Sequence, residues 1–216
     1  RDMRVSDNHA LLAAYKHANA KKIPMAVAFC LYDKTGNRAR EHYEFMLAGL
    51  KEVEATLHKL NIPLIMLLGN PKERLSGLFH HTEPDAVYYD FNPLRGPRSV
   101  VKHLSNMEIP QYVVDTHNVV PVWETSDKLE VGAYTIRPKL HKKLDTYLTE
   151  PEQLKKQTKS WPGDVQSVDN LHDNIQKILS KQPKNNTKVT FTSGESASKK
   201  YLDKFISHKL ERYAVD

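Results

Sequence analysis

Aromatic and acidic side chains stand where two of the predicted strands end. Tyr32 ends the apolar stretch 24–32, Asp33 follows it, and Phe91 follows the stretch 85–90. An aromatic ring can stack against a planar ligand while a neighbouring carboxylate hydrogen-bonds to the edge of that ligand. Rings at the ends of buried strands can also simply pack in the core. The sequence leaves both interpretations open.

A second polar group opens the chain in "RDMRVSDN". Ser6, Asp7 or Asn8 can cap a helix that starts near His9, because a side-chain oxygen accepts hydrogen bonds from the free N–H groups of a helix start. Arg1 and Arg4 can pair with Asp2 or Asp7. These residues predict a structural loop, and the alternative is a loop that borders a ligand pocket or another domain.

A third polar stretch, "HNVVPVWETSDK", predicts a turn in which Ser126 or Asp127 caps a helix and Glu130 reaches back as in a capping box. Trp123 can transfer electrons in principle, although a lone tryptophan usually belongs to a core or an interface. The stretch 137–143 is basic and predicts either contacts with nucleic-acid phosphates or a solvated helix end. Its basic residues are Arg137, Lys139, His141, Lys142 and Lys143.

Cysteine, histidine and glycine patterns argue against several kinds of chemistry. Cys30 is the only cysteine, which excludes an internal disulfide, and its place in "VAFCL" predicts a buried strand residue. His80 and His81 are adjacent with no third ligand three or four positions away, so we predict no metal site. The chain contains neither GxGxxG nor GxxxxGK[ST], which argues against a nucleotide-dependent dehydrogenase or an NTPase.

Apolar stretches and helical stretches alternate along residues 1–148. The apolar runs predict buried strands at 24–32, 63–69, 85–90 and 111–116, and the spacing of apolar residues predicts helices at 40–60, 72–81 and 97–107. This alternation predicts an α/β fold, a Rossmann-like doubly wound parallel sheet with helices on both faces. Ligands of such sheets bind outside the carboxyl ends of the strands, where the groups described above should lie.

The remainder of the chain changes character. A helical stretch at 132–148 is followed by a proline-containing polar stretch at 149–193, which we interpret as an interdomain linker, and by a helix within 194–216. Ser193 or Ser196 can cap this last helix. Its apolar stripe, formed by Tyr201, Leu202, Phe205, Ile206 and Leu210, has nothing downstream to pack against and predicts a missing domain or a dimer contact.

The composition limits the kinds of binding partner that the chain can have. The formal net charge of +6 and the pI near 9.2 permit an anionic partner, and much of the basic surplus lies in residues 151–216. No apolar run approaches the roughly 20 residues of a membrane span, and no cationic leader opens the chain. We therefore expect a cytoplasmic protein without a membrane partner.

Three stretches resemble one family. "RDMRVSDN" with the following "ALLAA" resembles the segment after the first strand of the photolyase and cryptochrome family. Residues 116–148, "THNVVPVWETSDKLEVGAYTIRPKLHKKLDTYL", resemble class II cyclobutane pyrimidine dimer photolyases. The final "YLDKFISHKLERYAVD" resembles the helix that leads into the flavin-binding domain of that family.

The resemblance implies a function for a longer parent protein. Such a lyase repairs UV-damaged DNA when light drives an electron from reduced FAD to a flipped-out pyrimidine dimer. The flavin domain would follow Asp216 and a first strand would precede Arg1, so no catalytic residue lies in this chain and the chain alone should be inactive. The amino-terminal domain would carry an antenna folate or deazaflavin, for which the candidate residues are Arg4, Asp7, Asn8, Tyr32, Asp33 and Phe91.

Two other function classes stay open. The chain can be a photolyase-related module that binds a chromophore or a partner and repairs nothing. A generic nucleotide-binding α/β protein is the third interpretation. The oligomeric state is open in all three.

Overall fold

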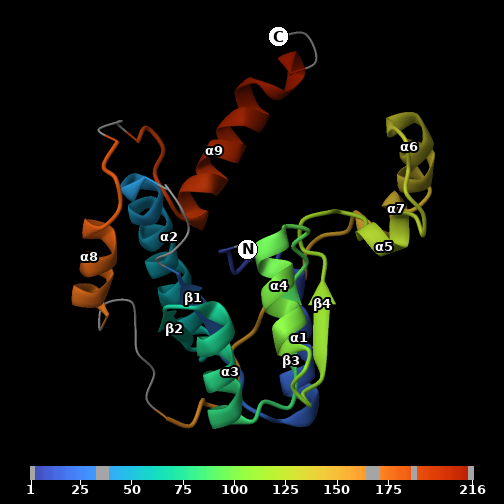
Figure 1. Cartoon of the computed structure of the whole chain (residues 1–216). Coiled ribbons are helices and arrows are strands. Elements are labelled where there is room, and N and C mark those ends of the chain that lie inside the picture. Colours follow the sequence, from blue (N-terminus) through green and yellow to red (C-terminus); the bar gives the residue numbers. More distant parts are fainter. Residues whose placement is uncertain (1–2, 33–38, 164–170, 186–188, 214–216) are drawn as a thin grey trace.

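Four short strands form the centre of the fold in the described part of the chain (Figure 1). The computed structural model describes residues 3–32, 39–163, 171–185 and 189–213. Strand β1 (Val27–Leu31) pairs in parallel with β2 (Leu64–Leu68), and β3 (Val87–Asp90) pairs in parallel with β4 (Gln111–Val114). The registers align Val27 with Leu64 and Val87 with Gln111. Within these ranges the strands therefore form two separate two-stranded sheets.

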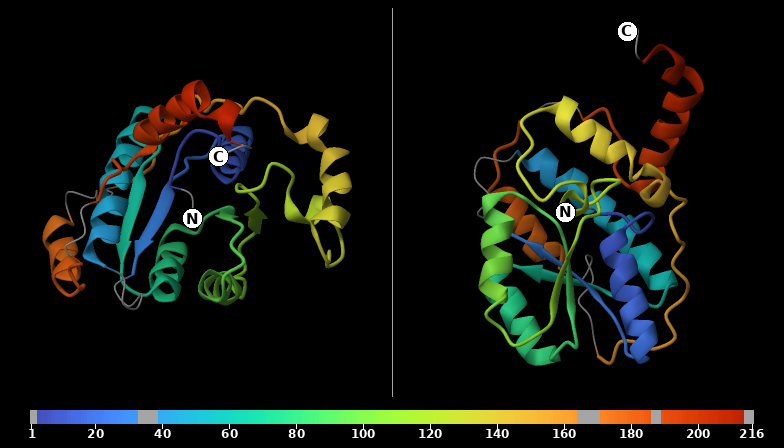
Figure 2. Two further views of the ribbon diagram at one scale, coloured as in Figure 1. Left: turned by 90° about the horizontal axis from the view of Figure 1, so that it is seen from above. Right: turned by 90° about the vertical axis from the view of Figure 1, so that its right-hand side faces the viewer.

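Helices cover both faces of the strands (Figure 2, left). Helices α1 (His9–Lys21) and α2 (Arg40–Lys59) lie on one side, and α3 (Pro71–Thr82) and α4 (Arg95–Leu104) lie on the other. The α/β class with parallel strands and helices on both faces is confirmed. The strands are shorter than predicted, in part because Pro24 and Pro63 have no N–H to donate to a ladder.

Local signals explain where α1 and α3 begin. The side chain of Asn8 accepts a hydrogen bond from the backbone N–H of Leu11 at 3.0 Å, and Asn70 caps α3 in the same manner with Pro71 at the first helical position. Helix α1 ends at Lys21, and its C-cap residue Lys22 has a left-handed conformation with φ of 57°. Of the capping residues predicted at the start of the chain, Asn8 is the one that caps α1.

One apolar core lies between α2 and the sheet of β1 and β2. Leu50 and Leu57 of α2 and Ile62 after it are each 1% exposed, and they pack with Leu31 of β1 and Leu64 of β2. Apolar residues at helical spacing give α2 the buried face that packs in this core.

Residues of α1 and the start of β3 are joined by an ionic cluster at the amino edge of the strands. The Asp85 carboxylate lies 2.8 Å from the Lys21 ammonium and 2.5 Å from Nε2 of His17. Tyr88 Oη lies 3.0 Å from the other ring nitrogen of His17 and its ring stacks on Tyr112. Hydrogen bonds from Lys21 and then His17 hold the pKa of Asp85 below its usual value.

The helix predicted over 132–148 forms as two pieces. Helix α6 (Ala133–His141) and the single turn α7 (Leu144–Tyr147) follow the short α5 (Val122–Thr125). No helix begins at Ser126 or Asp127, so the predicted capping box is wrong. The Ser126 hydroxyl does donate to Glu130 at 2.6 Å, but both residues lie in irregular chain before Gly132.

The stretch interpreted as a linker packs against the α/β fold. Gln157 is 2% exposed, and its backbone N–H donates to Leu60 O at 2.8 Å. Helix α8 (His172–Ser180) lies beside α2 (Figure 1). Apolar residues of the segment 171–179 enter the core: Leu171, Ile175, Ile178 and Leu179.

Helix α9 (Glu195–His208) and the 3-10 turn after it (Leu210–Arg212) project away from the strands (Figure 1). Gly194 occupies the N-cap position of α9 with φ of 103°, and neither Ser193 nor Ser196 caps the helix, so the predicted serine cap is wrong. Most of the predicted apolar stripe is exposed: Tyr201, Leu202, Ile206 and Leu210.

No helix in the described ranges is long and apolar enough to cross a membrane.

Candidate functional site

The loop at 3–8 lies at the carboxyl ends of β3 and β4, the edge where the sequence places ligand-binding loops. Arg4 folds back on this loop and donates to the backbone oxygen of Asp7 at 2.7 and 3.1 Å. It also donates to Thr116 O at 3.3 Å, which ties the loop to the chain after β4. Asp7 has a left-handed conformation with φ of 51°. The polar residues of this loop therefore hold the backbone in place.

Thr116 joins three segments at this edge. Its hydroxyl donates to Oδ1 of Asp90 at 2.7 Å and accepts from the N–H of Ala10 at 3.3 Å. Thr116 is only 4% exposed. The hydroxyl can donate once and accept once here, so one small side chain satisfies both the end of β3 and the start of α1.

Asp115 fixes the turn that follows β4. Its carboxylate accepts hydrogen bonds from the backbone N–H groups of His117, Asn118 and Val122 at 3.0 to 3.2 Å. Burial opposes ionisation of Asp115, but these bonds and those from the Asn118 side chain together hold its pKa below the ordinary value. No role was predicted for Asp115 from the sequence. Its signal is an aspartate directly after a strand and three positions before an asparagine, a common turn pattern.

A residue from the far end of the chain completes the edge. The Glu195 carboxylate, in the first turn of α9, accepts from Val5 N–H at 2.8 Å and from Ser6 N–H at 3.0 Å. Glu52 of α2 accepts from the backbone N–H and the hydroxyl of Ser196. Carboxylates thus hold the start of α9 against α2 and the loop at 3–8.

The aromatic candidates follow strands of two different sheets. Phe91 makes an edge-to-face contact with Trp123, with ring centroids 5.7 Å apart. Tyr32 follows β1 in the other sheet, where its backbone oxygen accepts from the hydroxyl of Tyr43 at 3.5 Å. Asp33 lies outside the described residues. The contact of Phe91 with Trp123 fits packing, and neither Phe91 nor Tyr32 lines the two cavities described next.

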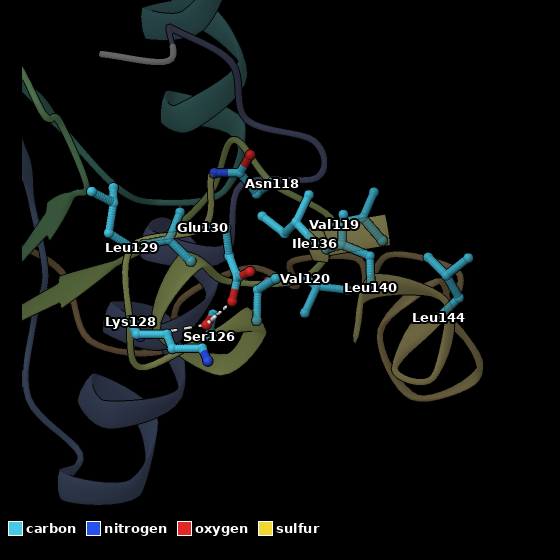
Figure 3. Close-up of a pocket in the computed structure, with 12 residues that line it drawn as sticks. Asn118, Val119, Val120, Ser126, Lys128, Leu129, Glu130, Ile136, Leu140 and Leu144 are labelled. Carbon is cyan, nitrogen blue, oxygen red and sulfur yellow. Dashed lines mark hydrogen bonds between the residues drawn. The ribbon is translucent and has the colours of Figure 1, made fainter. Parts of the chain in front are cut away.

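A cavity of about 520 Å³ lies beside this edge, between the turn at 118–122 and α6 (Figure 3). Its walls are mainly apolar and include Val120, Ile136 and Leu140. A smaller cavity of about 240 Å³ lies between the loop at 3–8 and the chain near Glu152. The first volume is within the range of small-molecule sites, although the antenna candidates do not line it.

Polar residues line one side of the larger cavity. Glu130, whose side chain is 10% exposed, lies 2.5 Å from Nζ of Lys139 and accepts from the Ser126 hydroxyl. The hydrogen bond from Lys139, followed by that from Ser126, lowers the pKa of Glu130 to about 2. Glu130 is therefore ionised at neutral pH.

The basic stretch 137–143 is only partly available to an anion. Lys139 pairs with Glu130, and Lys143 lies 3.3 Å from the Glu124 carboxylate. Arg137 and Lys142 are exposed. Two of the basic side chains are thus engaged within the fold, which lowers the charge that this stretch offers to phosphates.

The Cys30 thiol is a poor nucleophile in this fold. Burial raises the pKa of the Cys30 thiol to about 11, with Arg74 opposing, so the thiol is protonated and unreactive at neutral pH. Cys30 is half-buried rather than fully buried. Within the described ranges, no three histidine, cysteine or acidic side chains are grouped in a way that could hold a metal ion.

The parallel strands, the covering helices and the polar carboxyl edge define an α/β domain of the Rossmann-like class. The cryptochrome of Synechocystis sp. PCC6803 superposes with a TM-score of 0.70 at 16% identity, over 99% of this chain and 46% of its own. A class III photolyase from Agrobacterium tumefaciens superposes with a TM-score of 0.64 at 21% identity, over 95% of this chain and 43% of its own. At these identities the likeness shows the fold alone.

Sequence comparison shows the family. The DNA photolyase family model matches residues 1–158. The deoxyribodipyrimidine photo-lyase of Potorous tridactylus is 42% identical over 153 residues, which cover 69% of this chain and 29% of that protein. The Arabidopsis thaliana deoxyribodipyrimidine photo-lyase is 35% identical over 228 residues, covering 100% of this chain and 45% of that protein. The chain belongs to the DNA photolyase family, and it spans less than half the length of these relatives.

Proposed function

We propose that the parent protein is a class II photolyase that repairs cyclobutane pyrimidine dimers in UV-damaged DNA, with this chain as its amino-terminal α/β domain. The match of the family model to residues 1–158 carries this proposal, together with relatives whose printed names are deoxyribodipyrimidine photo-lyase. The likeness of residues 116–148 to class II enzymes supports the choice of class.

The proposed reaction is a carbon–carbon lyase reaction driven by light. When bound in the parent protein, reduced FAD would supply the light-driven transfer of one electron to a dimer turned out of the duplex. Cleavage of the two bonds that join the pyrimidines would return that electron, so the reaction would consume no net electrons. Extrusion of the dimer is required because the reacting bonds are hidden within the base stack.

The FAD and the dimer pocket belong, in this proposal, to a helical domain that follows residue 216. The exposed apolar residues of α9 fit a helix that packs against such a domain. The 216-residue chain alone is therefore expected to repair no dimers.

The domain carries, in this proposal, an antenna chromophore, a folate or a deazaflavin. Tyr32, Asp33 and Phe91 remain its predicted contacts at the strand ends, with Arg4, Asp7 and Asn8 shaping the adjoining loop. An archaeal photolyase from Sulfolobus tokodaii, which superposes with a TM-score of 0.62, was solved with two FAD molecules. A second flavin is thus an alternative antenna.

The product of the complete natural reading frame tests the proposal. Its absorption spectrum should show flavin bands, and its mass should be about twice the 24.8 kDa of this chain, because the chain covers 45% of the plant relative. It should convert dimer-containing oligonucleotides to intact ones in light and leave them unchanged in the dark. A product near 24.8 kDa without flavin would contradict the proposal and favour the non-catalytic chromophore-binding or interaction module.

Substitutions test the antenna contacts separately. In the full-length protein, Tyr32→Leu and Phe91→Leu should lower the ratio of antenna absorbance to FAD absorbance in the purified protein. Val131→Leu, at an exposed position away from both strand ends, is the control. An unchanged ratio in both variants would remove these two residues from the antenna site.

A further inference from the structure

A tyrosine, a histidine and an aspartate are hydrogen-bonded in series at the amino edge of the strands. The phenol oxygen of Tyr88, in β3, lies 3.0 Å from Nδ1 of His17, in α1, 71 positions away in the sequence. Nε2 of the same ring lies 2.5 Å from the carboxylate of Asp85, just before β3. Figure 1 shows α1 alongside β3, and the three side chains join these two elements.

The Asp85 carboxylate determines which nitrogen of His17 carries the proton. Hydrogen bonds from Lys21 and then His17 hold the pKa of Asp85 below its usual value, so the carboxylate is ionised at neutral pH and can only accept. Nε2 therefore carries the hydrogen that faces Asp85. In the neutral imidazole Nδ1 then has the free lone pair, and it accepts the hydrogen bond of the Tyr88 hydroxyl.

This arrangement places a base on the phenol of Tyr88. A phenol that loses one electron becomes a strong acid, so its oxidation is easiest where a base can take the proton at once. His17 is such a base at hydrogen-bond distance. The neighbouring Tyr89 donates instead to the side-chain oxygen of Gln111 at 3.1 Å, and an amide oxygen is too weak a base for this role.

The surroundings of Tyr88 favour the same chemistry. Burial, followed by the neighbouring Tyr112, raises the pKa of Tyr88, so the phenol keeps its proton until it is oxidised. The ring of Tyr88 stacks on that of Tyr112 with centroids 4.9 Å apart, and a neighbouring π-face stabilises a ring that becomes electron-poor. Tyr112 is 47% exposed, so a dissolved oxidant can reach the stacked pair.

The proton that leaves Tyr88 would also have a favourable destination. On His17 it creates an imidazolium whose Nε2 faces the Asp85 carboxylate at 2.5 Å, and an opposite charge at this distance stabilises the cation. The Lys21 ammonium, 2.8 Å from both oxygens of Asp85, holds that carboxylate in place and partly offsets its charge.

We propose that Tyr88 is a redox-active tyrosine, which loses one electron to a dissolved one-electron oxidant while its phenolic proton passes to His17. The oxidant is an aromatic radical cation or an oxidised metal complex. The O–H bond of Tyr88 breaks, an N–H bond forms at Nδ1 of His17, and a neutral tyrosyl radical remains beside the imidazolium. One electron from a small reductant such as ascorbate restores the phenolate oxygen, to which His17 returns the proton. The site is thus a reversible sink for oxidising equivalents.

Photo-oxidised ruthenium tris-bipyridine is the oxidant that tests this proposal in the full-length protein, with any bound flavin in its oxidised form. Samples frozen after a flash in mildly alkaline buffer should show the electron paramagnetic resonance signal of a neutral tyrosyl radical. Tyr88→Phe should remove most of this signal. Tyr134→Phe, at a tyrosine that is 77% exposed, is the matched control and should leave the signal unchanged. A signal that survives Tyr88→Phe would overturn the proposal.

The role of His17 as proton acceptor has its own readout. Transfer to a positioned base contributes roughly 10²- to 10⁴-fold, so His17→Ala should slow formation of the radical at least about tenfold, and added imidazole should restore part of the rate. Formation should be slower in heavy water in the original protein and insensitive to heavy water in His17→Ala. A histidine with a structural role alone would leave both proteins insensitive, which would overturn the proposal.

Asp85→Asn keeps the shape of the Asp85 side chain and removes its charge, so it covers the case in which His17→Ala does not fold. This variant should also form the radical more slowly, because the imidazolium loses its stabilising partner. An unchanged rate would contradict the proposed role of the carboxylate. The oxidant is external and neither flavin nor DNA takes part, so this inference can fail while the proposed function stands.

Discussion

The hydroxyl of Thr116 links two elements at the carboxyl ends of the strands. It donates to Asp90 at the end of β3 and accepts from the N–H of Ala10 at the start of α1, and Thr116 is almost fully buried. A buried N–H or carboxylate that loses its partner costs more free energy than the hydrogen bond contributes when present. The edge should therefore be sensitive to changes that keep the shape of this side chain and remove its oxygen.

Replacement of Thr116 by valine tests this sensitivity. The Thr116→Val variant should lower the free energy of unfolding by about 1 to 3 kcal/mol, because Ala10 N–H loses its acceptor while the volume is conserved. Urea unfolding measures the change. Thr116→Ser keeps the hydroxyl and should cost less, and a valine variant as stable as the serine variant would show that the hydroxyl is dispensable.

Asn8 provides a second measurement on the same loop. The Asn8→Ala variant should lose about 1 kcal/mol of unfolding free energy, since the N–H of Leu11 loses its cap. Asn8→Asp retains a capping oxygen and serves as the control. Thermal or urea unfolding of both variants separates loss of the cap from loss of the amide group.

Glu130 gives stability a defined pH dependence. Its pKa in the fold, about 2, is below its ordinary value of 4.5, so its contribution is present above about pH 4.5 and is lost as the pH falls toward 2. At pH 7 the Glu130→Gln variant should unfold at a lower urea concentration than the original chain. The difference should shrink as the pH is lowered from 5 to 2, and a constant difference would rule out this ionisation as the cause.

At the scale of elements, the start of α9 is tied to the loop at 3–8 by the two hydrogen bonds of Glu195. The Glu195→Ala variant should speed hydrogen exchange at Val5 and Ser6 by about tenfold, because both amides lose their acceptor. Glu211→Ala, at an exposed acidic position after α9, is the matched control. Unchanged exchange at Val5 and Ser6 would show that another contact holds the loop.

The main elements could be predicted because their signals are local. The run "PLIMLLG" is apolar on both faces and yields β2, and the spacing of Leu47, Leu50, Val53 and Leu57 yields the buried face of α2. Breaks within elements were harder to predict. The helix expected at 132–148 divides around Lys142 and Lys143, and no single residue there marks the division.

At the scale of the whole molecule, contacts between distant parts of the chain could not be predicted. The bonds from Glu195 to Val5 and Ser6 join residues about 190 positions apart, and a carboxylate at a helix start does not name its partner. Gln157 likewise looks like an ordinary polar residue of a linker, yet it is buried against the chain at Leu60. The family, by contrast, could be predicted from three stretches, and the family model confirms it.

For the antenna candidates, too, contacts between distant parts of the chain could not be predicted. Sequence position placed Tyr32 and Phe91 at strand ends correctly, but whether two strand ends share one pocket depends on what lies between β1 and β3. Their shared role stays a prediction for the full-length protein.

The tie between Glu195 and the loop at 3–8 also sets an order of events during synthesis. Chains emerge from the ribosome amino-terminus first, and domains begin to fold as they emerge. Strands β1 to β4 and helices α1 to α4 are complete once residue 114 has emerged. The hydrogen bonds that Glu195 accepts from the loop at 3–8 can form only after residue 195 has emerged. A ribosome-bound chain stalled before that point would hold an assembled α/β fold whose opening loop is still exposed to proteases.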